Sequence, residues 1–596
     1  GLGSDATVSI NGISGKQIKF FIDGIPVDYL GNGLSINVLP VSLIDRIEVY
    51  KGIIPIELGS DALGGAMNVI TKKSINSYLD VSYSIGSFNT YKASLNGYHL
   101  FPNSHFFTSI NTFYNYSDNN YFVDVDIPDE NGNPVRKRVR RFHDAYQNYL
   151  GSMEIGALKT KWADLLSIVG RISGMHDNVQ HNPTNIEQPY AKVTQQERAI
   201  NATLKFQKSD ILKKLDANFY AGYNRISSLS VDTSIYTYTW DGTPYLFFGN
   251  PVVHPYVGEK SSNRKLLFFN TNNVVGRLNL KYGISETSNL TANIISSFYQ
   301  RKGRDTIQEK YYGRNYFQQP ESMHKTVFGL AFEKKLFGGK LTSITSLKYY
   351  YYKANGFEIN SNNEQVLVEQ KKSQSGFNKA FRWRFSNQFL ARASYEFATR
   401  LPDVSEAFGD FLDVNPNPGI LPETSHNINA GVLYTGKKVG IEFNGFYRNT
   451  DHIIYLKTSR FFSQNQNLLK SETKGFEIEM KYKPLRFISF STNATFQDIR
   501  NKSLLENSGT FDNRYYNARM PNIPYFFGNG EVRLSKENKD KHIHSIQIWW
   551  NMNYVHEFYL YWSTDGDKDK KAVIPTQFVQ NAGISCSLLK QSLSVS

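Results

Sequence analysis

The chain has 596 residues, a formal net charge of +14 and only 40% hydrophobic residues. No run of 18 or more apolar residues occurs, which excludes a helical membrane protein. Aromatic residues make up 14% of the chain, including 38 Tyr and 41 Phe. Such richness is typical of transmembrane β-barrels, whose strands alternate apolar and polar faces and end in aromatic girdles.

The positive charge is spread along the chain, so we expect no nucleic-acid partner. Its densest basic run is RKRVRR at 136–141. Such a run attracts lipopolysaccharide phosphates or an anionic ligand, although a solvated loop explains it equally well. The single cysteine, Cys586, excludes an internal disulfide.

Residues 1–73 differ in composition from the rest of the chain. They are rich in glycine and in small or β-branched apolar residues, and they hold few aromatics. This composition predicts a small mixed α/β unit with a core. Within it we expect a short helix over 41–44, after Pro40, followed by a strand over 45–50.

From about Ser77 onward the sequence alternates with a period of two. A strand that crosses a membrane needs about 9–11 such residues, whereas soluble strands average about 5–6. Because backbone groups in lipid must all be paired, the predicted sheet has to close into a barrel. A soluble β-sandwich or propeller is the alternative. In 78–86 the apolar residues of one face are Leu79, Val81, Tyr83 and Ile85.

Connections between the expected strands are either very short or long and polar. Segments 86–89 and 337–340 are predicted short turns, which face the periplasm in outer-membrane barrels, and segments such as 355–375 are predicted outward loops. The span 77–596 suits a barrel of about twenty strands, which is too wide for side chains alone to fill. Residues 1–73 are the candidate plug for this lumen.

Three elements near the N-terminus occur in a fixed order: FIDGIPV at 21–27, IDRIEVYKG at 44–52 and LGSDALGGAMNVIT at 58–71. They resemble the second half of the plug domain of TonB-dependent receptors. Two further stretches resemble barrel signatures of that family. These are 397–425, which contains FATRLP, EAFG, NPN and LPETS, and 474–479, which reads KGFEIE.

The sequence also departs from the family pattern. Residues 418–420 are additional within NPNPGILPE, and Ala430 stands where the family often has Glu. The first half of the plug, the TonB box and the final strands are not recognised in the chain, whose ends both look trimmed. We expect residues 1–73 to be the C-terminal part of the plug domain and residues 74–596 to be the transmembrane β-barrel with its last strands missing.

The resemblance implies a large antiparallel transmembrane β-barrel of the 22-stranded type, with an N-terminal mixed α/β plug inside the lumen, in the outer membrane of a Gram-negative bacterium. It also implies active import of a scarce large ligand, driven by the TonB–ExbB–ExbD complex, with outer-membrane lipid and lipopolysaccharide around the barrel. A ferric siderophore is the favoured ligand, and haem or cobalamin are alternatives. A glycan or peptide importer beneath a surface-exposed lipoprotein is a further alternative, and a passive porin belongs to a different class.

No Ser-His-Asp, paired-carboxylate or metal-binding motif stands out, so we expect neither an enzyme nor a cofactor or metal site. His176 and His181 share one segment, and His426 follows PETS. They are candidate haem or metal ligands, although lone loop histidines are usually polar surface.

Arg46 and Glu48 face one side of the expected strand, and a charge buried in a lumen must be paired. The resemblance implies an ionic lock between plug and barrel, for which Glu423 and Glu477 are the candidate barrel partners. The alternative is that each charge meets lumen water. Four plug glycines are predicted to permit tight turns and close packing: Gly52, Gly59, Gly64 and Gly65.

By resemblance, the turns at 14–17 and 29–32 face outside and form the floor of the ligand pocket. Lys16 and Gln17 offer hydrogen-bond donors, and Tyr29 offers a flat face with a hydroxyl. These groups suit an anionic or oxygen-rich ligand, although solvated turns would carry the same residues. The candidate ligand-binding residues are Gly15, Lys16, Gln17, Tyr29 and Asn32.

Overall fold

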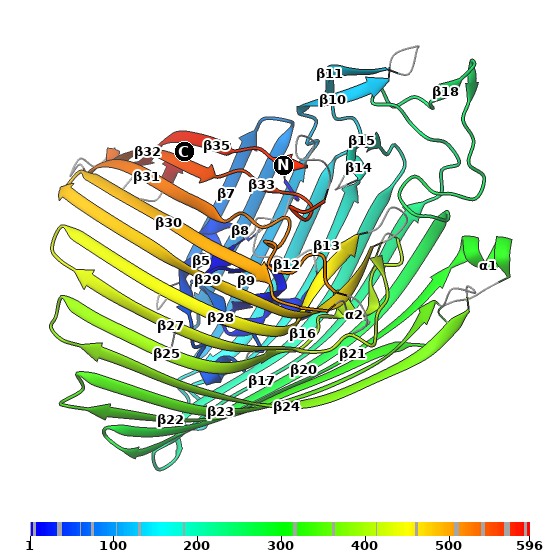
Figure 1. The fold of residues 1–596 in the computed structure, drawn as a ribbon. Coiled ribbons are helices and arrows are strands. Elements are labelled where there is room, and N and C mark those ends of the chain that lie inside the picture. The colour runs from blue at the N-terminus through cyan, green and yellow to red at the C-terminus, as the bar shows by residue number, and fades with distance from the viewer. Residues whose placement is uncertain are drawn as a thin grey trace.

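The computed structural model shows one large β-barrel whose lumen holds the N-terminal segment (Figure 1). Among the described residues, no helix is long and apolar enough to span a membrane. The structure describes residues 2–3, 8–31, 39–59, 61–72, 77–102, 104–128, 133–182, 185–313, 317, 319–359, 364–412, 414–458, 463–505, 512–537, 543–565, 572–588 and 593–595.

The N-terminal segment, the plug, is built on a four-stranded sheet with the order β4–β3–β6–β5. β3 and β6 run parallel, and the other two pairs are antiparallel. The predicted helix at 41–44 is a 3-10 turn and the predicted strand at 45–50 lies within β5, which confirms both predictions. The plug elements are β1 (Ser9–Ile10), β2 (Ile13–Ser14), η1 (Gly15–Gln17), β3 (Lys19–Ile22), β4 (Ile25–Pro26), η2 (Val27–Tyr29), η5 (Val41–Leu43), β5 (Ile44–Lys51), η6 (Ile56–Leu58) and β6 (Gly65–Thr71).

Apolar side chains hold the plug together and join it to the barrel. Phe21 of β3 packs with Ile54 and Leu58, all of them buried. A second cluster places Ile13 of the plug with Ala398 of the barrel wall. Burial of each large aliphatic or aromatic side chain contributes about 1.5–3 kcal/mol, so the plug and the barrel share part of one core.

Among the described residues, 22 strands form a single closed barrel. Consecutive long strands pair antiparallel, whereas the short β26 pairs with β29 in parallel. The expected fold, a large antiparallel barrel around a plug, is therefore confirmed. The barrel strands are β7 (Tyr78–Gly86), β8 (Thr90–Leu100), β9 (Phe106–Ser117), β12 (Tyr146–Leu158), β13 (Leu165–Asn178), β16 (Thr194–Leu212), β17 (Leu215–Asp232), β20 (Lys265–Ser285), β21 (Ser288–Asp305), β22 (Glu321–Leu336), β23 (Leu341–Ile359), β24 (Gln365–Arg384), β25 (Phe389–Arg400), β26 (Val414–Asn415), β27 (Glu423–Thr435), β28 (Val439–Thr458), β29 (Ser463–Leu485), β30 (Ile488–Asn501), β31 (Phe526–Glu537), β32 (Ile543–Val555), β35 (Gln577–Leu588) and β36 (Leu593–Val595).

The outward face of the barrel is apolar, as the two-residue alternation predicts. On β7, Leu79, Val81 and Ile85 are each between 67% and 69% exposed. Polar side chains such as Asn96 and Asn115 are buried on the lumen side. This division matches a wall that meets lipid outside and polar groups inside.

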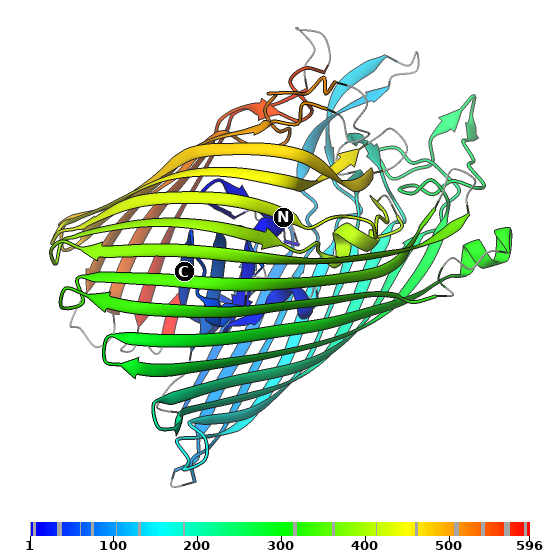
Figure 2. The same cartoon turned by 60° about the horizontal axis from the view of Figure 1, so that its bottom comes forward.

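The two ends of the barrel differ, and we call them the short-turn end and the loop end (Figures 1 and 2). The turn at 337–340 lies at the short-turn end, but the turn at 86–89 lies at the loop end, where Asp118 N donates to Phe88 O at 3.0 Å. That turn was expected at the short-turn end, and this expectation is wrong. Successive connections alternate between the two ends, and β9 leads into the long loop-end connection, so the β7–β8 turn must also lie at the loop end. The loop-end elements are β10 (Phe122–Pro128), β11 (Pro134–Arg140), β14 (His181–Asn182), β15 (Asn185–Pro189), β18 (Leu246–Phe247), β19 (Asn250–Pro251), α1 (Thr306–Tyr312), α2 (Val404–Phe408), β33 (Phe558–Tyr559) and β34 (Val573–Ile574).

Most of the predicted loop 355–375 is strand. β23 continues to Ile359 and pairs with β24 from Gln365 onward. The apolar alternation fades in this hairpin although backbone pairing continues, because beyond the lipid neither face of a strand needs to be apolar. Hydropathy therefore marks the membrane-spanning part of a strand and not its end.

The plug fits closely against the barrel wall at Gly59. This residue adopts a left-handed φ of +60°, and a Cβ there would lie 2.7 Å from Cγ2 of Ile295 on β21. Gly15 has a φ of +61°, but a Cβ there would meet nothing within 4 Å. We expect Gly59→Ala to destabilise the plug by about 1–3 kcal/mol more than Gly15→Ala, because only Gly59 also clashes with the barrel. Limited proteolysis of the plug measures this difference, and equal susceptibility of the two variants would contradict it.

Candidate functional site

The plug turn η1 lies beside the connection between β25 and β27 at the loop end. Lys16 Nζ is 3.3 Å from Asp403 Oδ1, and the Lys16 side chain is 56% exposed. The Asp403 carboxylate raises the pKa of Lys16 above its usual value, so this side chain is cationic at neutral pH. Asp403 also caps α2, because it accepts a hydrogen bond from Ser405 N at 3.1 Å. Of the predicted ligand residues, Gly15 and Lys16 thus lie on the open side of the plug.

A buried arginine joins this connection to the barrel and the plug. Arg400 donates to both carboxylate oxygens of Glu406, at 2.9 and 3.0 Å, and to both of Glu423, at 2.8 and 2.9 Å. Glu423 also accepts from Gln17 Nε2 at 3.1 Å. We call this cluster the Arg400 hub. Arg400 and Glu406 were not predicted as an ion pair, although both lie in the barrel motif and the spacing of Asp403 and Glu406 indicates a capping box.

Lys19 lies behind η1 in an otherwise apolar strand. Its Nζ is 2.8 Å from Asp28 Oδ2 and 3.5 Å from Asp61 Oδ1. Burial disfavours the charged form, but Asp28 and Asp61 outweigh it and raise the pKa of Lys19 well above its usual value. Lys19 was not predicted. A lysine inside the apolar run IKFFI was the available signal, because a buried cation must be paired.

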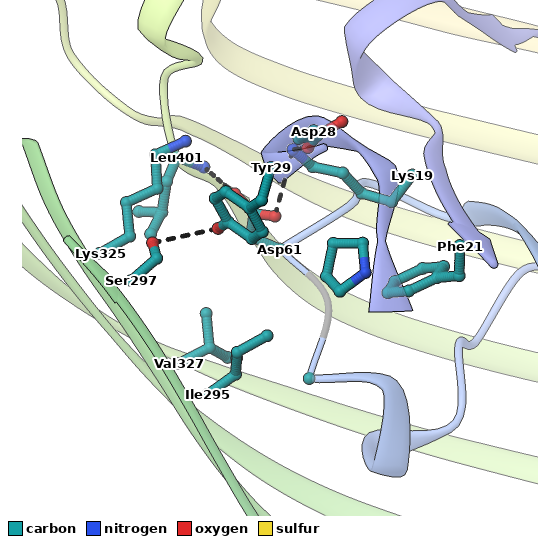
Figure 3. Close-up of a pocket in the computed structure, with 12 residues that line it drawn as sticks. Lys19, Phe21, Asp28, Tyr29, Asp61, Ile295, Ser297, Lys325, Val327 and Leu401 are labelled. Carbon is teal, nitrogen blue, oxygen red and sulfur yellow. Dashed lines mark hydrogen bonds and ion pairs between the residues drawn. The ribbon is translucent and has the colours of Figure 1, made fainter. Parts of the chain in front are cut away.

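A small cavity of about 30 Å³ lies between this part of the plug and β21 and β22 (Figure 3). Lys325 of β22 faces Asp61 across it. Tyr29 lines the cavity and donates its hydroxyl to Ser297 Oγ of β21 at 3.0 Å. Tyr29 therefore contacts the barrel wall, although it was predicted to bind ligand. The fifth predicted ligand residue, Asn32, lies outside the described residues.

A second charged cluster ties the plug to the wall at the end of β5. Lys51 Nζ lies 3.6 Å from carboxylate oxygens of both Glu442 and Glu477, and 3.7 Å from Glu479. Glu477 Oε1 also accepts from Asn11 N at 2.5 Å. The predicted barrel residues Glu423 and Glu477 thus both contact the plug, but through Gln17 and Lys51.

The predicted pairing of Arg46 and Glu48 with those glutamates is wrong. Arg46 Nη2 is 2.8 Å from Glu48 Oε1, its Nη1 is 3.0 Å from Asp45 Oδ2, and its side chain is 58% exposed. β5 is an edge strand of the plug sheet, and side chains alternate along a strand. Arg46 and Glu48 therefore share one face and pair with each other, while Lys51 faces the opposite way.

The predicted structural glycines lie at turns and close approaches. Gly52 has a φ of +90° and a Cβ there would lie 3.4 Å from Ser394 Oγ of the wall. Gly64 also has a positive φ, of +139°. Gly65 begins β6, where a Cβ would come within 3.2 Å of Ile10. Together with Gly59, these positions lie within the plug or against its contact with the barrel.

Three loop-end connections pack into one body that we call the outer clasp. Glu259 accepts from Ala191 N at 2.5 Å and from Lys192 N at 3.0 Å. Trp240, which is buried, donates Nε1 to Ile186 O at 3.1 Å. Burial raises the pKa of Glu259 to about 7. The clasp consists of the described residues of 118–145, 179–193 and 233–264.

The basic run 136–141 lies mainly on β11 of this clasp. Arg136 Nη1 is 3.3 Å from Asp126 Oδ1, and Arg138 stands opposite Asp124 in the β10–β11 register. Aspartates on the neighbouring strand therefore offset part of the positive charge.

The three histidines considered as haem or metal ligands have other partners. The His176 ring bonds to Asn178, the His181 ring to Asn182 O and the His426 ring to the hydroxyl of Tyr395. Within the part of the chain that the structure describes, no three His, Cys, Asp or Glu residues gather as a metal site.

Two family models match most of the chain. Residues 139–585 match TonB dependent receptor-like, beta-barrel, and residues 1–66 match TonB-dependent Receptor Plug Domain. The chain belongs to the TonB-dependent receptor family. The resemblance drawn from the plug and barrel motifs is therefore confirmed.

This TonB-dependent receptor is similar in sequence to Vitamin B12 transporter BtuB of Vibrio vulnificus (strain CMCP6), with 39% identity over 105 residues. That match covers 16% of this chain and 17% of the transporter, well under two thirds of its length. In fold it is similar to Copper transporter OprC, with a TM-score of 0.71, 14% identity and coverage of 97% of this chain and 83% of that one. The ferric yersiniabactin uptake receptor FyuA from Yersinia pestis gives a TM-score of 0.67, 13% identity and coverage of 98% and 84%.

The Arg400 hub should dominate the stability of the receptor's loop end. We expect Arg400→Met to lower the free energy of unfolding by about 3–5 kcal/mol, because it leaves Glu406 and Glu423 buried without their cation. Urea unfolding of the receptor in lipid vesicles measures this loss. Adding Glu406→Gln and Glu423→Gln to Arg400→Met should restore most of it, and an equally unstable triple variant would contradict the electrostatic cause.

The outer clasp should loosen as pH rises. Because the pKa of Glu259 is raised from its usual 4.5 to about 7, the folded clasp binds this proton more tightly than the unfolded chain does. The associated stability is complete below about pH 4.5 and is lost as pH rises through about 7. We expect the amides of Ala191 and Lys192 to be better protected from hydrogen exchange at pH 5 than at pH 8. Glu259→Gln should flatten this dependence, and an unchanged profile in that variant would assign it to another group.

Proposed function

We propose that this TonB-dependent receptor actively imports a large, scarce ligand across the outer membrane, and that the ligand is a ferric siderophore. Active import is supported by the bonds between the plug and β20, β21, β27, β28 and β29. A large ligand passes only when some of these bonds break, which requires work on the plug. We assign that work to the TonB–ExbB–ExbD complex.

The donor groups on the open side of the plug support an anionic or oxygen-rich ligand. Lys16 presents an exposed ammonium group next to the open turn at Gly15. Gln17 and Tyr29 are already bonded to Glu423 and Ser297. We therefore propose Lys16 as the principal plug contact, and Gln17 as a second contact once Glu423 releases it.

A chelated metal fits this receptor better than a bare metal ion. FyuA, which shares the fold, is a ferric yersiniabactin uptake receptor, whereas OprC is a copper transporter. A bare ion needs several protein ligands in a defined geometry, and among the described residues no group of three His, Cys, Asp or Glu is arranged to hold a metal ion. A siderophore supplies those ligands itself and leaves the protein to bind its polar surface.

Cobalamin is the second candidate, because the stretch similar to BtuB reaches 39% identity. A haem, glycan or peptide ligand, and a surface lipoprotein partner, gain no specific support from the described contacts. A passive porin is disfavoured because the plug occupies the lumen. Neither a catalytic role nor a resident cofactor is part of this proposal.

Growth of a deletion strain tests the ligand. Each culture receives a single iron source, either a ferric siderophore from a panel, haem or ferric chloride, and a parallel set depends on supplied cobalamin. We expect the deletion to abolish growth on at least one ferric siderophore and the intact gene to restore it. A defect confined to cobalamin would select the second candidate, and wild-type growth on every source would refute import of either class.

A further inference from the structure

The connection between β25 and β27 bends into the lumen on the loop side of the plug, where α2 lies (Figures 1 and 2). We call its described residues, 401–412 and 414–422, the strap. Leu401, Phe408 and Ile420 are at most 1% exposed. Loops at a barrel mouth are usually solvated. The burial of these residues shows that the strap packs inside the barrel.

One side of the strap is fixed to the barrel wall. Arg301 of β21 donates to Phe408 O at 2.9 Å and to Gly409 O at 3.0 Å, and its Nε donates to Glu321 at 2.7 Å. Phe411 packs into an apolar cluster on the same wall. These contacts are buried and include a charge-assisted network, so this side of the strap is its strong attachment. The wall residues of that cluster include Leu267, Phe269 and Phe357.

The other side of the strap contacts the plug through fewer groups, of which Lys16 is exposed. Leu401 N donates to Asp61 at 3.2 Å, and Asp403 bonds to Lys16 at 3.3 Å. Among the described residues, Asp403 is the one ion-pair partner of Lys16. Asp403, in contrast, also accepts from Ser405 N and Ser405 Oγ. The carboxylate therefore keeps partners when the ammonium group leaves it, and the exposed ammonium group can take another anion in its place.

We propose that the strap latches the plug from the loop side, and that an anionic group of the ligand opens this latch by replacing Asp403 at Lys16. This inference rests on the proposed function and adds its regulation. The exchange keeps the number of ion pairs of Lys16 the same, because an anionic oxygen of the ligand replaces a carboxylate oxygen of Asp403 at the same ammonium group. An ion pair with an exposed partner is worth at most about 1 kcal/mol, so the ligand's other contacts suffice to drive the exchange.

Opening the latch weakens the attachment of the plug to the barrel. Once Lys16 binds the ligand, the remaining hydrogen bond from η1 to this side of the barrel, among the described residues, is the one from Gln17 to Glu423 of the Arg400 hub. The plug apex then follows the ligand, while Arg301 keeps the strap on the wall. An empty receptor would thus hold its plug more firmly than a loaded one.

Urea-induced pore opening of the purified full chain in planar lipid bilayers tests the latch without ligand or energy source. Lys16→Gln and Asp403→Asn are compared singly and together, and Asn keeps the cap of α2 because it caps as well as Asp. We expect each single variant to raise the open fraction at a fixed urea concentration about threefold, and the double variant to add nothing further. Additive effects, or no effect, would overturn the latch. The matched control is Lys353→Gln with Glu369→Gln, a surface pair 3.0 Å apart on β23 and β24, which should leave the open fraction unchanged.

Citrate, a small anion with several carboxylates, tests the exchange in the same bilayers. Added to the chamber that faces the loop end, it should raise the open fraction of the wild-type receptor but not that of Lys16→Gln. Sodium chloride at equal ionic strength separates specific exchange from screening. Equal effects of citrate and chloride would overturn ligand exchange at Lys16. Because no step involves cells or TonB, these outcomes are independent of the growth test for import.

Discussion

Polar groups that are removed from water need partners, and this requirement joins the plug of this receptor to its barrel. The plug's irregular segments leave backbone carbonyls without partners in their own sheet. Barrel side chains supply the missing donors, as Arg277 does to Gly24 O, Asn427 to Leu63 O and Arg448 to Asn11 O. Because these bonds accept at backbone carbonyls, the barrel recognises the path of the plug's main chain as well as its side chains.

Two charged clusters attach the plug within that frame. The Arg400 hub lies toward the loop end and contacts the plug through Gln17, and Lys51 at the end of β5 meets three glutamates of the barrel. The Arg400 hub pairs its own charges and offers the plug one hydrogen bond, from Gln17, whereas the Lys51 ion pairs form only when the plug sits in this position.

The loop end combines two kinds of structure that serve import differently. The outer clasp is held by a buried Trp240 and by Glu259, and it stands at one side of the loop end. The strap is fixed on the barrel side by Arg301 but meets the plug through the half-exposed Lys16. The Lys16–Asp403 pair is the exposed contact between strap and plug, so a ligand that enters from the loop end can compete for it most easily.

The sequence by itself determined the architecture. Two-residue alternation predicted the outward face of β7, and the ordered plug motifs predicted a family that the matches over 1–66 and 139–585 confirm. Such features are local, because a strand's faces follow from its own residues. The partners of Glu423 and Glu477 were decided only by the tertiary structure. Both Arg46 and Lys51 are basic residues of β5, and the sequence does not tell which of them meets the barrel. The position of this edge strand in the lumen points only Lys51 at the wall.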